Sequence, residues 1–303
     1  NQKSLKNKLL KSIKWWNTES LTSQNYWWNA IGVPLRMGET FLLLGDELPE
    51  NDRLKGVASM KLGIKPDFYD YHGVATGQNL VWLATIHLMI GVLEKDATAL
   101  KRAFGAVYEE IKITTEEGIQ PDYSFHQHGP QLYSGGYGLG FTKNSAQLIR
   151  LAQDTPFAFP SEKITLFSDF VTEGQQWMIR GQTFDHSSVG REIARSSSPA
   201  ATVELAKLTA QFKGPRQAER QTMALRIAGK AAPLAGNRHF WRSDFMAHHR
   251  AKYYSSVKMA SNRILASESG NKENIRGYHL GQGVQLIYRT GNEYKNIFPV
   301  WDW

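Results

Sequence analysis

The chain has 303 residues and a mass of 34.3 kDa, more than one average domain, so two domains are expected. Hydrophobic residues make up 41% of it and charged residues 21%, which excludes intrinsic disorder, collagen-like repeats and coiled coils. The formal net charge of +8 suits an anionic partner, and the absence of cysteine excludes disulfides and thiolate chemistry.

The first two thirds of the chain are predicted to be helical, because apolar residues recur there with helical spacing. Thr76 is the predicted N-cap of one helix, which places Asn79 in its opening turn. The longest apolar run, residues 80–93, contains polar residues and falls short of the roughly 18 residues that span a bilayer. We therefore expect a soluble chain.

The pattern changes in the last quarter of the chain. Residues 254–267 and 284–288 alternate as strands do, and residues 289–293 supply a turn. We predict an α+β layout with a helical domain at residues 1–236 and the start of an antiparallel β domain at residues 237–303. A few strands cannot close a sheet domain, so we expect the chain to be a piece of a longer protein.

The positive charge is concentrated in one segment. Residues 201–263 contain twelve Lys and Arg but three Asp and Glu, whereas the remainder of the chain is nearly balanced. Such an excess suits a polyanion, which could be a nucleic acid, an anionic glycan or a membrane surface. A solvated basic face is the alternative interpretation.

Two patterns have weak catalytic interpretations. His126 and His128 could bind a metal, but no third ligand stands near them in the sequence. Glu116, Glu117 and Asp122 could supply a glycosidase-type carboxylate pair. Acidic surface residues at the end of a helix are the more ordinary explanation of that group.

Two aromatic segments fit a carbohydrate site better. Trp27 and Trp28 lie in a cluster flanked by Asn25 and Asn29, and sugar rings stack on such faces while amides bond their hydroxyls. Adjacent residues of a helix or strand point in different directions, so we expect at least one of the two tryptophans to face a cleft.

The densest group of functional side chains lies in residues 122–138, a glycine-rich loop with imidazole, phenol and amide groups. Further on, Arg191 and Arg195 are four residues apart. Donors, a cation and a base are what proton abstraction beside a carboxylate requires. Tyrosine is a poor base at its usual pKa of about 10, so a nearby arginine would be needed to lower it.

At these residues the chain resembles polysaccharide lyase family 8, which contains chondroitin AC, hyaluronan and xanthan lyases, and within it most resembles the chondroitin AC branch. His128 and Tyr137 stand nine residues apart, as in the chondroitin AC and hyaluronan branch. Six ordered segments carry the resemblance: residues 25–34 (NYWWNAIGVP), 76–79 (TGQN), 127–138 (QHGPQLYSGGYG), 190–195 (GREIAR), 267–274 (SESGNKEN) and 296–301 (NIFPVW).

The resemblance implies an incomplete α/α toroid followed by an antiparallel β-sandwich domain, of which this chain would hold the first strands. It implies a lyase that cleaves uronic-acid-containing glycosaminoglycans, chondroitin sulfate or hyaluronan, by β-elimination. The partner would be an acidic polysaccharide rather than a nucleic acid or a membrane. The enzyme would be a monomer, secreted or periplasmic, with its signal peptide outside this chain.

The resemblance also implies roles for individual residues. Asn79 would neutralise the uronate carboxylate, and His128 would assist there and at the C5 proton. Tyr137 would act as general base on C5 and then as general acid towards the leaving O4. Arg191 would lie beside Tyr137 and favour its phenolate form, while Glu268 would position the His and Arg groups.

Further residues would bind the substrate or a metal. Arg195 and Asn271 would contact the polysaccharide, and Trp27 and Trp28 would stack on its sugars. No cofactor would be required for the chemistry. Asp302 matches a position that binds structural calcium in some chondroitin lyases.

Three alternatives remain open at this point. The chain could be a non-catalytic module that binds acidic polysaccharides, or a lyase for another acidic glycan such as xanthan. It could also be an α/α-toroid hydrolase that uses Asp122 and Glu117, whose products would be saturated sugars.

Overall fold

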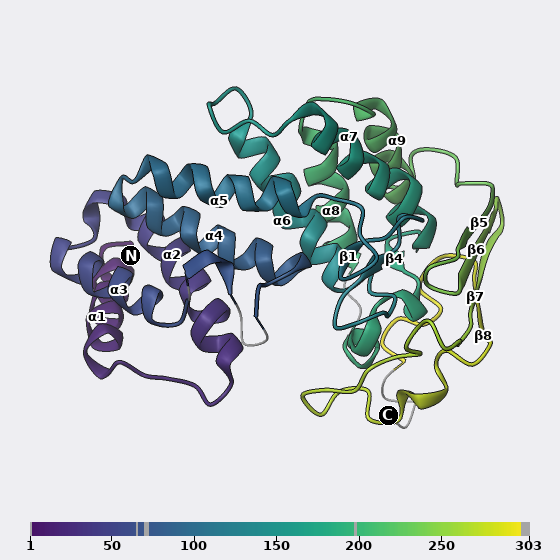
Figure 1. Ribbon diagram of the computed structural model, residues 1–303, viewed down its shortest axis with the longest axis horizontal. Helices are drawn as coiled ribbons and strands as arrows, with labels where there is room; N and C mark the ends of the chain where they lie inside the picture. Colours follow the sequence, from purple (N-terminus) through teal and green to yellow (C-terminus); the bar gives the residue numbers. More distant parts are fainter. Residues whose placement is uncertain (1, 65, 70–72, 197–198, 298–303) are drawn as a thin grey trace. The chain divides into compact units, whose positions relative to one another are not determined.

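A computed structural model describes residues 2–64, 66–69, 73–196 and 199–297 (Figure 1). The chain divides into two compact units, unit 1 (Asn1–Val107) and unit 2 (Tyr108–Trp303). The predicted order of the elements is confirmed, because helices predominate as far as Ile227 and a four-stranded antiparallel sheet begins at Gly236.

Unit 1 is helical. Its elements are α1 (Gln2–Glu19), the π turn η1 (Trp28–Gly32), α2 (Val33–Leu44), η2 (Gly45–Glu47), α3 (Glu50–Leu62), η3 (Pro66–Phe68), α4 (Gly77–Glu94) and α5 (Ala97–Glu110). Helix α4 is the most buried of them, and Val81, Ala84 and Ile86 have no exposed surface. Its position in the core explains why polar residues are few along it.

Helix α4 begins where the sequence predicts. Thr76 has extended backbone angles at the N-cap, and the buried Asn79 lies in the first turn. The helix ends at Lys95, whose φ of 57° is left-handed and stops the helical hydrogen-bond pattern.

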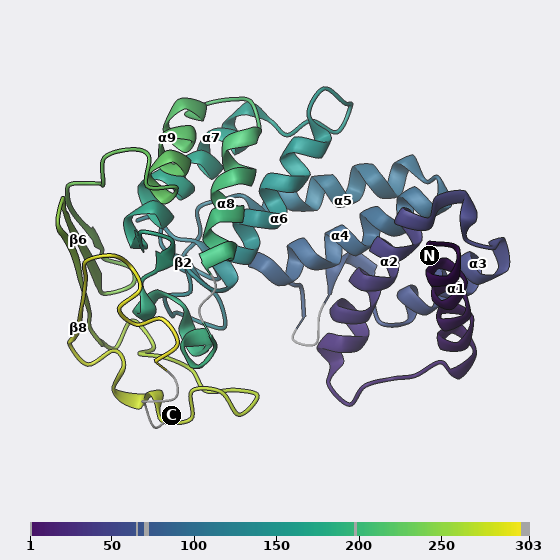
Figure 2. The same ribbon diagram turned by 180° about the vertical axis from the view of Figure 1, so that it is seen from behind.

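Unit 2 combines helices with short strands and one larger sheet. Its elements are β1 (Gly118–Ile119), β2 (Phe125–His126), α6 (Tyr137–Ala152), α7 (Ser161–Asp169), η4 (Phe170–Gly174), η5 (Gln175–Met178), β3 (Ile179–Arg180), β4 (Thr183–Phe184), η6 (His186–Ser188), η7 (Gly190–Ala194), α8 (Pro199–Gln211), α9 (Gln217–Ile227), β5 (Gly236–Phe240), β6 (Phe245–Arg250), β7 (Tyr253–Lys258), η8 (Gly277–His279) and β8 (Val284–Tyr288). Figure 1 and the reverse view in Figure 2 place the short strands between helices α6–α9 and the sheet.

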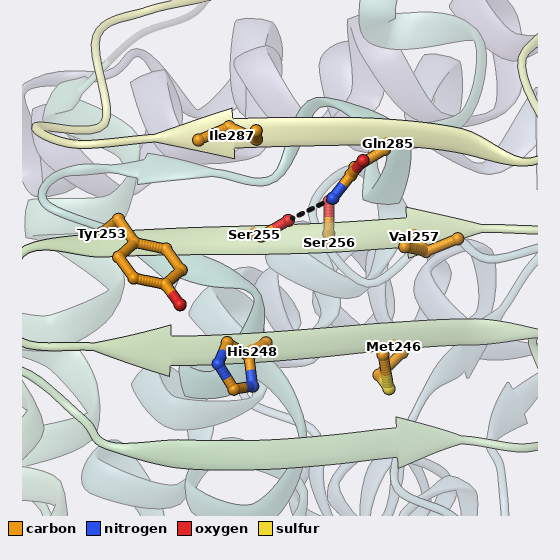
Figure 3. A pocket seen from close by; sticks show the side chains of 8 residues that line it. All are labelled: Met246, His248, Tyr253, Ser255, Ser256, Val257, Gln285 and Ile287. Atoms are coloured by element: carbon orange, nitrogen blue, oxygen red, sulfur yellow. Dashed lines mark hydrogen bonds between the residues drawn. The ribbon is translucent and has the colours of Figure 1, made fainter.

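The sheet is an antiparallel meander in the order β5-β6-β7-β8. Alternate residues along β6 and β7 are buried, so one face of the sheet packs against the rest of unit 2. The opposite face carries Met246, Tyr253 and Ile287, which are 40–53% exposed. These side chains line a shallow pocket with Ser255 and Gln285, whose amide donates to the Ser255 hydroxyl at 3.2 Å (Figure 3).

The strand predicted at residues 254–267 is shorter than expected. It ends at Lys258, because Lys258 pairs with the first residue of β6, Phe245, and with the first residue of β8, Val284. The Met259 N–H still donates to the Asp244 carbonyl at 2.9 Å, but both neighbouring strands have ended at this point. Residues 259–283 instead form an irregular loop with the short helix η8, and this loop carries Glu268.

Candidate active site

Four of the predicted catalytic side chains converge within unit 2. His128 lies on the loop after β2, Tyr137 is the first residue of α6, and Arg191 belongs to η7. Glu268 reaches them from the loop between β7 and β8. The site is therefore built from segments that are up to 140 residues apart in the sequence.

Glu268 is the centre of this group. Its carboxylate accepts hydrogen bonds from the Arg191 Nη1 at 2.6 Å and from the Tyr133 hydroxyl at 2.9 Å. The Nδ1 atom of His128 lies 3.1 Å from each of the two carboxylate oxygens. Because a carboxylate only accepts, Nδ1 carries the proton in this contact, which leaves Nε2 as the ring nitrogen available to a ligand.

The proton on Nδ1 of His128 also determines the nature of its contact with Arg191. The Nη1 atom of Arg191 lies 3.1 Å from Nδ1 of His128. Guanidinium groups only donate, so this pair is a close approach around the shared Glu268 carboxylate rather than a hydrogen bond.

Tyr137 lies beside both His128 and Arg191. Its ring centroid is 4.6 Å from that of His128 in an edge-on arrangement, and Arg191 Nη2 donates to its hydroxyl at 3.5 Å. The guanidinium carbon of Arg191 is 5.9 Å from the centre of the Tyr137 ring. The predicted proximity of Arg191 to the phenol is thus present in the structure.

Burial and the neighbouring charges have opposite effects on the pKa values of Tyr137 and Glu268. Burial raises the pKa of Tyr137 above its ordinary value, although the charge and hydrogen bond of Arg191 act to lower it. Burial would also raise the pKa of Glu268, but the hydrogen bond and charge of His128 and the charge of Arg191 hold it below the usual range. Glu268 is therefore an anion, while Tyr137 is a phenol.

Tight packing around Tyr133 fixes the backbone of the site. A Cβ atom at Gly190 would lie 2.2 Å from the Tyr133 ring, and Gly190 has a left-handed φ of 59°. The Tyr133 hydroxyl also accepts from the backbone N–H of Arg191 at 3.2 Å. Glycine at this position therefore lets η7 approach the ring closely enough to bring Arg191 to Glu268.

The segment that carries Arg191 is anchored to the sheet by the buried Asp185. Its carboxylate accepts from the backbone N–H of Ser187 at 2.8 Å and from the Ser256 hydroxyl of β7 at 2.5 Å. Lys258, also on β7, donates from its buried ammonium group to the Ser187 carbonyl at 3.3 Å. Burial lowers the pKa of Lys258 to about 8, while Asp185 acts in the opposite direction.

Arg195 has a strong partner that the sequence did not suggest. Its Nε and Nη2 atoms donate to the two carboxylate oxygens of Glu273 at 2.6 and 2.8 Å. The Nε atom of Arg191 donates to the same carboxylate at 3.3 Å. The hydrogen bond from Arg195 lowers the pKa of Glu273, so the carboxylate is charged.

Sequence reasoning missed Tyr133, Glu273 and Asn274. The Asn274 amide donates to the Ser267 hydroxyl at 2.7 Å and to the Glu268 carbonyl at 2.8 Å, which fixes the Glu268 backbone. All three lie inside segments that carry the family resemblance, and this was the only signal that could have pointed to them. Asn271, which was expected to contact the substrate, is an exposed residue with a left-handed φ of 53° and is not drawn into the cluster.

Three predicted residues belong to unit 1. Asn79 is buried in the first turn of α4. The rings of Trp27 and Trp28 meet edge to face at 5.1 Å, and Trp27 meets Trp82 in the same way at 5.6 Å. Trp28 is 50% exposed, which leaves one face of the pair open to a ligand.

The alternative catalytic groups have structural partners. His126 is buried and its Nε2 lies 2.9 Å from the Ser243 hydroxyl, and burial lowers its pKa to about 3. Asp122 accepts from Ser124, and Glu117 accepts from the backbone N–H of Gly129 at 2.8 Å. No cluster of three or more His, Asp or Glu side chains in the described part of the chain could hold a metal ion. Asp302 lies outside the described residues.

Many cations of the basic segment 201–263 are used inside unit 2. Arg220 is fully buried and donates to backbone carbonyls, including that of Thr209 at 2.7 Å. Three further arginines form ion pairs: Arg216 with Asp169 and Glu173, Arg238 with Glu173, and Arg263 with Asp244. Because these arginines form contacts within the fold, fewer cations of this segment can bind a polyanion than its net charge predicts.

Two family models match the chain. The model described as polysaccharide lyase family 8, N terminal alpha-helical domain, matches residues 1–227, and the one described as polysaccharide lyase family 8, super-sandwich domain, matches residues 235–303. The chain belongs to polysaccharide lyase family 8. The family predicted from the sequence is thus confirmed.

Individual relatives of this family 8 chain agree. A chondroitinase-AC of Pedobacter heparinus is 32% identical over 97% of this chain and 42% of its own length. A hyaluronate lyase HylB of Enterococcus faecalis is 25% identical over 86% of this chain and 32% of its own. A solved chondroitinase AC lyase, studied in oligosaccharide complexes, superposes with a TM-score of 0.90 at 30% identity, over 98% of this chain and 45% of that one.

These matches confirm the predicted fold class, an incomplete α/α toroid followed by an antiparallel β-sandwich domain of which this chain holds the first strands. The chain spans less than half the length of the relatives that it matches. Among the residues that the structure describes, no helix is both long and apolar enough to cross a bilayer.

Proposed function

We propose that the protein containing this chain is a polysaccharide lyase that cleaves uronic-acid-containing glycosaminoglycans by β-elimination, with chondroitin sulfate as first substrate and hyaluronan as second. The observation that carries the proposal is the contact of the half-buried Tyr137 with His128 and Arg191 around the Glu268 carboxylate. The family and the names of the relatives support the same reaction class.

The reaction has one chemical difficulty, which is to remove a proton from C5 next to a uronate carboxylate. The negative carboxylate disfavours a second negative charge at C5, so donors must neutralise it as the charge spreads into an enolate-like form. We assign this task to His128, whose Nε2 is free of the Glu268 contact, and to Asn79, as the family resemblance implies. Each well-placed donor contributes on the order of 3 kcal/mol to lowering such barriers.

Tyr137 moves the proton. Its phenolate oxygen takes the C5 proton, the C4–O4 bond breaks with its electron pair going to O4, and Tyr137 returns the proton to O4. The products are a new reducing end and a sugar with a C4–C5 double bond conjugated to the carboxylate. Arg191 favours the phenolate against the effect of burial.

The remaining site residues would bind the polymer. We assign sugar stacking to Trp27 and Trp28 and substrate contacts to Arg195 and Asn271. No electron is transferred and no water is consumed in this reaction, so no cofactor is required for it. A structural calcium ion at Asp302 remains a separate proposal.

We also propose domain bounds and a cellular location for the whole protein. We propose a toroid domain at residues 1–236 and a β domain that starts at residue 237, close to the start of the second family model at residue 235 and to the first residue of β5, Gly236. Polysaccharides of this class are too large to cross a membrane unaided, so we propose that the protein is secreted or periplasmic. As the family resemblance implies, we propose a monomer.

Digestion of chondroitin sulfate, hyaluronan and xanthan by the full-length protein tests the proposal. A lyase produces near-ultraviolet absorbance from the unsaturated uronate, with one new double bond for each bond cleaved. Saturated products would indicate a hydrolase instead. Binding of these polymers without any product would indicate a non-catalytic module, and cleavage of xanthan alone would place the substrate outside the glycosaminoglycans.

A further inference from the structure

Arg191 in η7 and Arg195, the residue directly after η7, share one carboxylate, that of Glu273. Arg195 forms a two-pronged pair with it at 2.6 and 2.8 Å, and Arg191 donates to it through Nε at 3.3 Å. Glu273 is thus the second carboxylate, after Glu268, that the loop between β7 and β8 supplies to this segment.

The pair leaves Arg195 little capacity for a substrate. Nε and Nη2 are taken by Glu273, and Nη1 lies 3.4 Å from the Glu192 carboxylate. A side chain that is 47% exposed is therefore neutralised in the protein without substrate. An anionic sugar would have to compete with Glu273 for this guanidinium group.

The contact with Arg191 has a different effect. Arg191 is held at three points, by Glu268 through Nη1, by Glu273 through Nε, and by Tyr137 through Nη2. A planar guanidinium group fixed at two of its edges can present only one orientation of the third. Glu273 therefore helps to set the direction in which Arg191 faces the Tyr137 hydroxyl.

We propose that Glu273 is a positioning residue that weakens the binding of the polysaccharide and speeds its cleavage. It withholds the charge of Arg195 from the anionic polysaccharide, and it orients Arg191 towards Tyr137. This inference rests on the proposed lyase function. It predicts that loss of the Glu273 charge makes the polymer bind more tightly while it is cleaved more slowly.

The test is Glu273→Gln in the full-length protein. An amide has one acceptor oxygen and no charge, so it cannot maintain the pair with Arg195 and the contact with Arg191 together. We expect Kd for a chondroitin oligosaccharide to fall roughly two- to fivefold, the range for a partly exposed ion pair. We expect kcat to fall roughly tenfold, because small displacements of catalytic groups are costly.

Two measurements separate these effects. Calorimetric titration of the oligosaccharide into proteins that also carry Tyr137→Phe gives Kd without turnover, and the near-ultraviolet assay gives kcat in the Tyr137 background. Neither a partly unfolded sample nor a loss of active protein lowers Kd. A tighter Kd with a slower kcat supports the proposal, whereas an unchanged or weaker Kd, or an unchanged kcat, overturns it.

Two further variants are the controls. Glu273→Asp keeps the charge, so Kd should return to within about twofold of the unmodified value. Glu219→Gln removes an equivalent ion-paired charge, that of the Arg216 pair on α9, and should change neither Kd nor kcat. If Glu219→Gln tightens binding as much as Glu273→Gln does, the effect is one of net charge and the proposal fails.

The result also distinguishes this inference from the function on which it rests. A protein that binds the oligosaccharide but releases no unsaturated product refutes the lyase function, and the Kd comparison still decides whether Glu273 restrains binding. An active lyase whose Glu273→Gln variant has unchanged Kd and kcat refutes the role of Glu273 alone.

Discussion

Arg191 Nη1 lies 2.6 Å from Glu268 Oε1, although the two residues are 77 positions apart in the sequence. Arg191 lies between helices α7 and α8 of unit 2, and Glu268 follows the third strand of the sheet. The arginine that contacts Tyr137 is therefore held in place by a loop of the β part. A displacement of that loop would alter the environment of the proposed base.

Tyr137→Phe removes the hydroxyl that transfers the proton and leaves the ring in place. We expect kcat to fall about 10²- to 10⁴-fold, as is typical when a general acid or base is lost, with little change in oligosaccharide affinity. The near-ultraviolet assay and calorimetry measure the two quantities. Tyr253→Phe, on the exposed sheet face, is the matched control and should retain full activity. Undiminished cleavage by Tyr137→Phe would show that another group abstracts the proton.

The rate should increase with pH. Burial raises the pKa of Tyr137 above its ordinary value, so the phenolate that acts as base is a minor species at neutral pH. Below that pKa, log kcat should rise with a slope approaching one per pH unit, from about pH 6 to at least about pH 9. Arg191→Gln should move this profile further towards alkaline pH, since the charge that lowers the pKa is lost. A rate that is flat across this range would contradict the assignment of Tyr137 as base.

Gly190→Ala introduces a Cβ atom 2.2 Å from the Tyr133 ring at a left-handed backbone position. Gly229→Ala introduces the same backbone strain, at a φ of 70°, where no atom lies within 4 Å. Each variant should lose about 1 kcal/mol in its free energy of unfolding from strain. Only Gly190→Ala should also lose activity, by about 10²-fold, because η7 must move. Equal activities of the two variants would show that the close packing on Tyr133 is not needed.

The protein should become less stable in acid through His126. Burial lowers its pKa to about 3, whereas in the unfolded chain it titrates near 6.5. Between these values the unfolded state binds more protons, so the contribution of neutral His126 is present above pH 6.5 and is lost as the pH falls towards 3. Urea unfolding at pH 7 and pH 4 should show a smaller loss for His126→Gln than for the unmodified protein. The exposed His239→Gln should behave like the unmodified protein.

The family resemblance led to His128, Tyr137 and Arg191, because each stands in a short sequence motif that can be matched without knowledge of the fold. The order of helices and strands followed from hydrophobic periodicity, which a local pattern carries. Periodicity did not predict the end of β7 at Lys258, because that end depends on where β6 and β8 offer hydrogen-bond partners. Alternation in residues 259–267 continues in the sequence but has no neighbouring strand to pair with.

The ion-pair partners of the charged residues were the other feature that the sequence did not predict. No local sequence pattern shows that Glu273 pairs with two arginines, since these partners are about 80 residues away. The ion-pair partners of residues 201–263 could not be predicted for the same reason. Arg216 pairs with Asp169 as well as with the nearby Glu219, and Arg238 pairs with Glu173. A local count assigns Asp169 and Glu173 to another segment.

The buried contacts of Asp185 with Ser256, and of Lys258 with the Ser187 carbonyl, have a consequence for the order in which the protein opens. If β7 detaches from the sheet, Asp185 loses its hydroxyl partner and the amide of Ser187 loses the environment that shields it. Hydrogen exchange at Ser187 should therefore slow or quicken together with exchange along β7, as one cooperative unit. Arg191, four residues after Ser187, would then lose this support each time β7 detaches from the sheet.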